Sequence, residues 1–170
     1  MSSEVERIYW DSCAWIAFFN REQGKVAVLR DLWDEAGRGR YQICTSTYAY
    51  MEVIHGIAEI GQPYPSELYD EIVFSYLNEP RVERITFDVE VAKLARAFKR
   101  QFHPILSKRP DAVHLASAAY WNCSCLYTYD GNDSLPLHNK VQRRDGEFLA
   151  IRAPASVAIG PLFLPHDDAT

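Results

Sequence analysis

Short apolar runs along the chain alternate with longer segments whose apolar positions recur at helical spacing. The short runs are rich in β-branched and aromatic residues and predict strands at 6–10, 41–44, 82–86, 125–129 and 148–157. The longer segments predict helices at 12–19, 22–36, 47–57, 66–77, 88–98 and 111–121. Asp88 is placed to cap the helix that follows it, and Pro110 suits a first helical turn.

This alternation predicts the fold class. Strands that alternate with helices form a parallel sheet covered on both faces, with right-handed crossovers, which is an α/β sandwich. Ligands of such folds bind beyond the carboxyl ends of the strands. Asp11 and Asp130 each follow a predicted strand, so we expect both at the same rim of the sheet.

The length and composition predict one folded domain. A chain of 170 residues with 48% hydrophobic and 24% charged residues is typical of a single globular domain, here 1–170, with 136–170 as a last strand and tail or a C-terminal extension. The longest apolar run, 13–19, is too short to cross a bilayer, and 1–7 lacks the pattern of a secretory signal. We therefore expect no membrane span and a cytoplasmic location.

The charge pattern permits only a local site for nucleic acid. A net charge of -5 is not compatible with a uniformly basic surface. One dense group of cations nevertheless leads into the helix at 111–121 and is predicted to contact phosphates; it consists of Lys99, Arg100, His103, Lys108 and Arg109. The other interpretation is a solvated helix end and loop, because cations at a helix C-terminus are also favoured by its dipole.

The four cysteines do not predict a zinc site or disulfides. Cys13, Cys44, Cys123 and Cys125 lie in apolar surroundings without CxxC spacing, and a second pair of ligands is not apparent. A chain of this size does not need disulfides for stability, so we expect buried, reduced thiols.

Four acidic residues are candidates for chemistry: Asp11, Glu52, Asp111 and Asp130. Singly, each has a structural explanation, because an aspartate after a strand often caps a helix and Asp111 suits the positive end of a helix dipole. Glu52 lies among apolar neighbours and is predicted to be buried, where it needs a partner. Converging carboxylates repel one another, and a divalent cation compensates this; oxygen ligands favour Mg²⁺ or Mn²⁺.

Four motifs in order resemble the PIN-domain nucleases. They are IYWDS at 8–12, MEV at 51–53, PDAVHLASA at 110–118 and LYTYD at 126–130, and the resemblance spans residues 8 to about 135. It implies a Rossmann-like three-layer α/β/α sandwich with a mainly parallel sheet. It also implies an acidic site made of Asp11, Glu52, Asp111 and Asp130. Residues beside these are implied to support the site, namely Ser12, Thr128 and, as a further ligand, Asp133.

The function implied by this resemblance is a Mg²⁺- or Mn²⁺-dependent endoribonuclease that hydrolyses RNA with metal-activated water and leaves a 5′-phosphate. Asp11 and Asp111 are the expected principal ligands, while Glu52 and Asp130 complete the coordination or orient water. Many members are toxins of toxin-antitoxin pairs, which implies a small antitoxin as a partner. Homodimers are common as well, and the exposed apolar residues of the helix at 66–77 are candidate contacts.

Two alternatives stay open from the residues. The first is a catalytically inert module that keeps the fold and binds RNA or a protein partner. The second is a phosphohydrolase with a nucleophilic Asp11, against which stands the lack of a second aspartate two residues later. The sequence has no Gly-x-Ser-x-Gly elbow, which weighs against a Ser-His-Asp hydrolase, and it has no glycine-rich phosphate loop.

Overall fold

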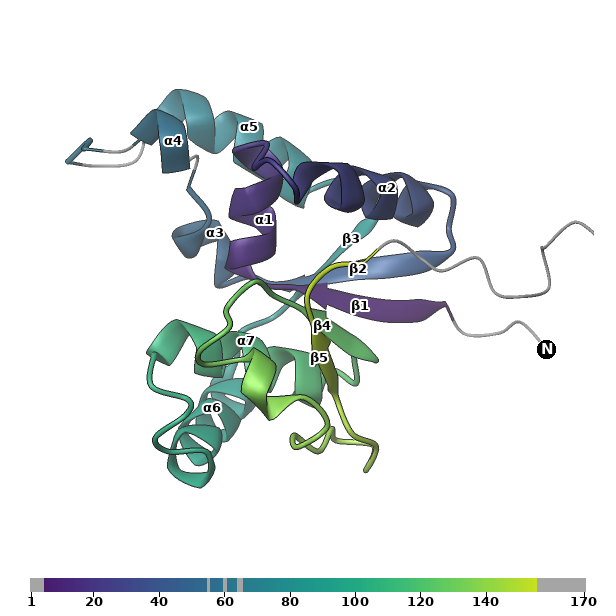
Figure 1. Cartoon of the computed structure of the whole chain (residues 1–170), viewed down its shortest axis with the longest axis vertical. Helices are drawn as coiled ribbons and strands as arrows, with labels where there is room; N and C mark the ends of the chain where they lie inside the picture. Colours follow the sequence, from purple (N-terminus) through teal and green to yellow (C-terminus); the bar gives the residue numbers. More distant parts are fainter. Residues whose placement is uncertain (1–4, 55, 60, 64–65, 156–170) are drawn as a thin grey trace, which may run out of the picture.

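The structure is a computed structural model that describes residues 5–54, 56–59, 61–63 and 66–155 (Figure 1). Its centre is a five-stranded parallel sheet in the order β3-β2-β1-β4-β5. The strands are β1 Glu6–Trp10, β2 Tyr41–Ser46, β3 Val82–Ile85, β4 Cys125–Tyr127 and β5 Ala150–Arg152. The predicted parallel α/β sheet is confirmed.

Helices cover both faces of this sheet. They are α1 Ser12–Phe19, α2 Val26–Gly37, α3 Ala49–Glu52, α4 Gly56–Glu59, α5 Glu67–Leu77, α6 Val89–Gln101, α7 Arg109–Tyr120 and the 3₁₀ turn η1 Leu135–Leu137. In Figure 1, α1 to α5 lie on one side of the sheet, whereas α6 and α7 lie on the other. The three-layer α/β/α sandwich expected from the sequence is therefore confirmed.

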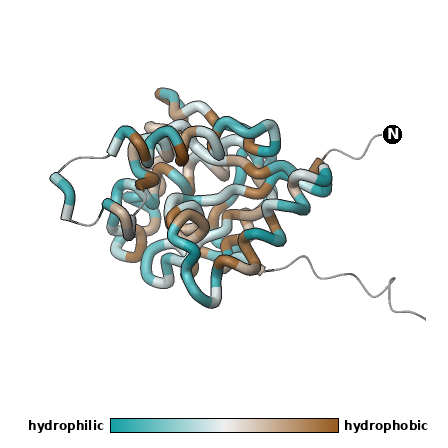
Figure 2. Tube along the Cα trace, turned by 90° about the horizontal axis from the view of Figure 1, so that it is seen from above, coloured by the Kyte–Doolittle hydropathy of each residue, from teal (hydrophilic) through white to brown (hydrophobic). Residues whose placement is uncertain are grey.

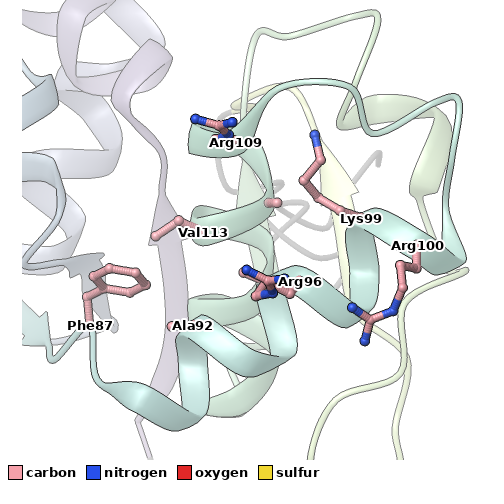
Figure 3. Close-up of a pocket in the computed structure, with 9 residues that line it drawn as sticks. Phe87, Ala92, Arg96, Lys99, Arg100, Arg109 and Val113 are labelled. Carbon is pink, nitrogen blue, oxygen red and sulfur yellow. The ribbon is translucent and has the colours of Figure 1, made fainter.

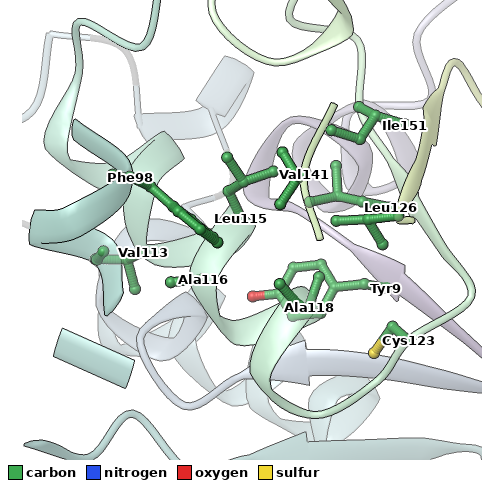
Figure 4. Close-up of a cluster of buried hydrophobic side chains, with 14 of the residues drawn as sticks. Tyr9, Phe98, Val113, Leu115, Ala116, Ala118, Cys123, Leu126, Val141 and Ile151 are labelled. Carbon is green, nitrogen blue, oxygen red and sulfur yellow. The ribbon is translucent and has the colours of Figure 1, made fainter. Parts of the chain in front are cut away.

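The side-chain alternation of the strands gives each layer its own core. In β1, Ile8 and Trp10 pack with α1, α2 and α5, while Tyr9 points to the opposite side and packs with α6 and α7. Figure 4 shows Tyr9 among Leu115 and Leu126 in this second core. Figure 2 shows hydrophobic segments gathered toward the middle and hydrophilic ones on the outer helices. β1 is buried on both faces, as in other central parallel strands.

The strand order reverses between β1 and β4, which lie side by side in the sheet. The chain moves outward from β1 through β2 to β3, and then returns to the other side of β1 to form β4 and β5. Such a reversal point is where open α/β sheets bind ligands. Just beyond the end of β1, the Asp11 N–H donates a backbone hydrogen bond to the Tyr127 carbonyl of β4 at 3.2 Å. This bond fixes Asp11 beside the end of β4.

Three predicted elements differ from the structure. The helix predicted over 47–57 is interrupted, because Val53 takes an extended conformation (φ -78°, ψ 109°) between α3 and α4. The strand predicted at 125–129 ends at Tyr127, since its neighbour β1 ends where α1 begins. The strand predicted at 148–157 pairs only over 150–152, and its last positions lie outside the described residues.

Other features bear directly on the predictions. The four cysteines are free thiols. Among the described residues, no helix is long and apolar enough to cross a membrane. The segment from 135 to 152 contributes buried Leu137, Val141, Leu149 and Ile151 to the core beside α7. A single domain over 1–170 stays a prediction, because 156–170 lie outside the described residues.

Candidate active site

The four predicted carboxylates lie near the start of α1. Burial is the main reason why the pKa of the Cys13 thiol is raised to about 12, and the negative charges of Asp11, Asp111, Asp130 and Glu52 raise it further. One thiol in the first turn of α1 therefore lies within the electrostatic reach of all four. The four carboxylates form two groups, Asp11 with Glu52 and Asp111 with Asp130.

Asp11 is buried and held by its neighbours. Its Oδ1 caps α1 by accepting a hydrogen bond from the Ala14 N–H at 2.9 Å. Burial raises the pKa of Asp11 above its ordinary value, and Glu52 contributes in the same direction. The nearby His114 ring and a hydrogen bond from Thr128 oppose that rise. Thr128 is thus a hydrogen-bond partner of this carboxylate.

Glu52 belongs to a network of side-chain hydrogen bonds. The Ser12 hydroxyl donates to Glu52 Oε2, and His114 Nε2 lies 2.6 Å from the same oxygen. The other ring nitrogen of His114, Nδ1, lies 2.7 Å from the Tyr9 hydroxyl, which accepts from the Ser46 N–H at 3.0 Å. All groups are satisfied when Tyr9 donates to Nδ1 and Nε2–H donates to Glu52.

The surroundings of Glu52 differ from those predicted. Its side chain is 26% exposed, and the neighbouring Met51 is 70% exposed. The prediction of a carboxylate enclosed by an apolar helix was wrong, because α3 has only four residues and turns its apolar side chains partly outward. Burial pushes the pKa of Glu52 upward, but His114 and the Ser12 hydroxyl together bring it below its ordinary value.

Asp111 is the carboxylate with the least compensation. It lies in the first turn of α7, is 9% exposed, and its Oδ2 is buried without a hydrogen-bond partner. Burial raises its pKa to about 6, with further increases from Asp130 and Asp133, while Lys108 acts in the opposite direction. The Lys108 Nζ is 3.7 Å from the unpartnered oxygen, beyond hydrogen-bond distance.

Asp130 lies beside Asp111 and is well compensated. Its Oδ1 accepts from the backbone N–H groups of Asn132 at 2.9 Å and Asp133 at 3.0 Å, which closes the turn after β4. Its Oδ2 forms an ion pair with Lys108 Nζ at 2.7 Å. Burial pushes the pKa of Asp130 upward, yet the lysine and the backbone donors hold it below its ordinary value.

Asp133 links the turn after β4 to the start of α7. Its Oδ2 accepts from the Ser107 N–H at 3.1 Å, the Ser107 hydroxyl at 2.8 Å and the Lys108 N–H at 2.9 Å. These bonds outweigh burial and lower the pKa of Asp133. With this oxygen in use, Asp133 positions the turn that carries Asp111.

Asp133→Ala is expected to destabilise the fold by about 1–3 kcal/mol, because the donors at the start of α7 lose their acceptor. The folded state lowers the pKa of Asp133, so its contribution is present above the ordinary carboxylate pKa and is lost as the pH falls through the lowered value. Urea unfolding at pH 7 and pH 3 measures both effects. Asp133→Asn, which keeps an acceptor oxygen, is the control, and equal stability of the alanine variant and wild type at pH 7 would contradict the positioning role.

The predicted RNA-contacting cations do not all lie together. Lys99, Arg100 and Arg109 line a groove between α6 and α7. Lys108 instead pairs with the site carboxylates, and the exposed His103 follows α6 outside the residues that line this groove.

Sequence reasoning missed residues on both sides of α7. His114 was given no role, although its spacing of three residues from Asp111 places both on one helix face. Arg96 and Phe87 also line the groove. The spacing of Arg96 with Lys99 and Arg100 on α6 was a usable signal, whereas Phe87 could be found only from the structure.

The donor set suits a hard divalent cation. Within the described ranges, no three His, Cys, Asp or Glu side chains stand grouped as a ready metal site. The acidic residues nevertheless offer only oxygen donors, and one of these, Asp111 Oδ2, is buried and unsatisfied. Oxygen donors select Mg²⁺ or Mn²⁺ over zinc, so the residues present fit such an ion. Lys108 is the internal counter-charge for Asp111 and Asp130.

Solved structures share this fold at low sequence identity. Mycobacterium tuberculosis VapC20, described as a sarcin-ricin loop cleaving toxin, is 14% identical with a TM-score of 0.58, covering 74% of this chain and 91% of its own. Rickettsia felis VapBC2 bound to a promoter DNA fragment is 13% identical with a TM-score of 0.56, covering 85% and 98%. A Klebsiella pneumoniae toxin-antitoxin complex is 19% identical with a TM-score of 0.54, covering 88% and 99%.

No curated protein matches the chain by sequence. One family model does, that of the PIN domain, and it covers residues 8–134, which is most of the chain and all of the carboxylates described above. The resemblance inferred from the sequence motifs is thereby confirmed, and the chain belongs to the PIN-domain family.

Proposed function

We propose that this protein is a Mg²⁺- or Mn²⁺-dependent endoribonuclease. The observation that supports this most strongly is the buried Asp111 Oδ2, which has no hydrogen-bond partner and only Lys108 Nζ, 3.7 Å away, as a counter-charge. A carboxylate kept in this state, with a pKa of about 6 and other carboxylates around it, lowers the stability of the fold. Such an arrangement is typical of a functional site rather than of a structural ion pair.

In this proposal Asp11 and Asp111 are the principal ligands of the cation, and Glu52 and Asp130 complete its coordination or orient water. Once bound, the cation supplies a Lewis acid for the scissile phosphate and lowers the pKa of a bound water. Ser12 and His114 hold Glu52, and Thr128 holds Asp11. Glu52 and Asp11 are thus held by neighbouring side chains before the cation or RNA arrives.

Lys108 has two functions in this proposal. It neutralises part of the charge of Asp111 and Asp130, so it competes with a metal cation for the same two carboxylates. Its exposed side chain also belongs to the predicted phosphate-contacting group with Lys99, Arg100, His103 and Arg109. A phosphate that approaches the site therefore meets a cation already placed beside Asp130.

The partner part of the proposal is a small antitoxin and a second copy of the chain. Fold neighbours that are toxins and toxin-antitoxin complexes support it. The outer side of α5 exposes Leu68 at 63%, Ile72 at 39% and Tyr76 at 36%, which is a suitable apolar contact surface. Light scattering of the purified chain, alone and with the product of a neighbouring small reading frame, tests this; a monomer with no binding would contradict it.

The alternative is an inert module on the same fold that binds RNA or protein. The experiment that separates the two is incubation of purified protein with single-stranded RNA in Mg²⁺ or Mn²⁺, with EDTA as the control. We expect cleavage that needs the metal and leaves a 5′-phosphate, and removal of the metal with EDTA should reduce it at least about a hundredfold. RNA that binds but stays intact with either metal would favour the inert module.

A further inference from the structure

A groove of about 530 Å³ lies between α6 and α7 (Figure 3). Its apolar lining comes from small residues of the two helices and from one ring after β3, namely Ala92, Ala95, Ala112, Val113 and Phe87. The remaining lining residues are all cations, namely Arg96, Lys99, Arg100 and Arg109. Its size is in the range of small-ligand sites.

The charge of the groove is opposite to that of the whole chain. The chain carries a net charge of -5, whereas every charged residue that lines the groove is positive. Within the described part of the chain, Arg96, Arg100 and Arg109 form no ion pair with an acidic side chain. Exposed cations gathered over an apolar floor are complementary to a ligand that is both polyanionic and flat.

Aromatic rings connect this groove to the candidate active site. Phe87 is 37% exposed, and its ring centroid is 5.8 Å from that of Tyr48, which is 6.0 Å from the ring of His114. A hydrogen bond between side chain and backbone helps to fix the spacing, because Thr47 Oγ1 accepts from the Phe87 N–H at 3.0 Å. His114 in turn contacts Glu52. The Phe87 end of the groove is therefore linked to the site by packed rings on one side of α7.

The other end of the groove reaches the site along α7 itself. Arg109 lies two residues before Asp111, in the same first turn. The groove and the carboxylates are thus separated by one helix, which is about 10–12 Å across with its side chains. A single-stranded RNA whose scissile phosphate lies at the carboxylates can therefore place a flanking nucleotide in the groove.

On the basis of the proposed nuclease function, we propose that this groove binds an unpaired nucleotide that flanks the cleavage position in single-stranded RNA. The base stacks on Phe87 over the alanine floor, and Arg96 and Lys99 contact the adjoining phosphates. Single-stranded RNA is favoured because its bases can leave the stack, whereas the bases of a duplex cannot. Stacking on an aromatic ring is tolerant of sequence, since every base has a π-face.

The test is the binding of a short single-stranded RNA that carries one 2-aminopurine, measured by fluorescence in EDTA so that cleavage does not interfere. Phe87→Ala removes the ring, Ala92→Trp fills the groove without changing its charge, and Arg96→Ala removes one cation. Two controls change exposed residues that do not line the groove, Phe148→Ala and Lys140→Ala. Thermal unfolding checks that every variant is folded.

We expect Phe87→Ala and Ala92→Trp to weaken binding about fivefold to a hundredfold, and Phe87→Ala to abolish the quenching of 2-aminopurine. Arg96→Ala should reduce the slope of log affinity against log salt by about 1, with both controls unchanged. This result supports the groove even if the protein does not cleave RNA.

Three results would overturn the proposal. The first is wild-type affinity in all groove variants; Mn²⁺-dependent cleavage by the same variants would then leave the nuclease function standing. The second is weaker binding by Arg96→Ala alone, which indicates general attraction without a base site. The third is unchanged RNA binding together with lost binding of an acidic protein partner, which makes the groove a protein interface.

Discussion

Asp111→Asn is expected to give a protein that is more stable than wild type without metal and almost inactive. The folded state raises the pKa of Asp111 from 3.8 to about 6, so the folded protein binds this proton more tightly than the unfolded chain. The stabilisation from the bound proton is complete below pH 3.8 and is lost as the pH rises to about 6. The neutral amide of the Asp111→Asn variant does not titrate, so this pH dependence is lost. The free energy of unfolding at pH 7.5 should be higher than that of wild type by about 1–3 kcal/mol.

Urea unfolding at pH 7.5 and pH 3.5 checks this prediction, and the difference between the two proteins should shrink at the lower pH. Mn²⁺ should stabilise wild type at pH 7.5 but have a much smaller effect on the variant, because one principal ligand is neutral. RNA cleavage should fall at least about a hundredfold. A variant that is less stable than wild type at pH 7.5 would contradict the conclusion that the charge of Asp111 is only partly compensated by Lys108.

The second large effect is expected for His114→Ala. The ring is buried and joins Tyr9, Ser12 and Glu52, so its removal leaves a cavity and unpaired polar groups. Such changes destabilise a protein by about 2–4 kcal/mol. Glu52 also loses the partner that orients it, and activity should fall about tenfold to a hundredfold at a temperature where the variant is folded.

Tyr9→Phe is the matched control for His114→Ala. It removes the hydroxyl that contacts His114 Nδ1 and accepts from Ser46, and it keeps the contact between His114 and Glu52. We expect a loss of about 1–2 kcal/mol in stability with activity close to wild type. Equal activity losses in the two variants, measured as kcat at saturating RNA, would mean that His114 acts only through stability.

Much of the fold could be predicted because its signals are local. The buried strands β1 and β4 show as short apolar runs, and Asp11 and Asp88 cap helices as their positions suggest. The reversal of strand order at β1 then brings Asp11 and Asp130 to one edge. Local pattern and general topology were enough for these features.

The remaining features depend on contacts between distant segments. The break after Glu52 was missed because its apolar neighbours suit a continuous helix, whereas packing exposes Met51 and extends Val53. Lys108 was predicted to face RNA, but its position depends on a turn some twenty residues later that carries Asp130. The pattern of the sequence shows which side chains carry charge, and only the packed structure shows which charges meet.

The most direct test of the acidic site is an anomalous-scattering map from crystals of this protein grown with Mn²⁺. We predict one or two manganese ions bound by carboxylate oxygens of Asp11 and Asp111, at about 2.1–2.2 Å, with Lys108 moved away from the carboxylate it now pairs with. Manganese absent from these two residues at millimolar concentration, or bound only elsewhere on the chain, would contradict the proposed metal site.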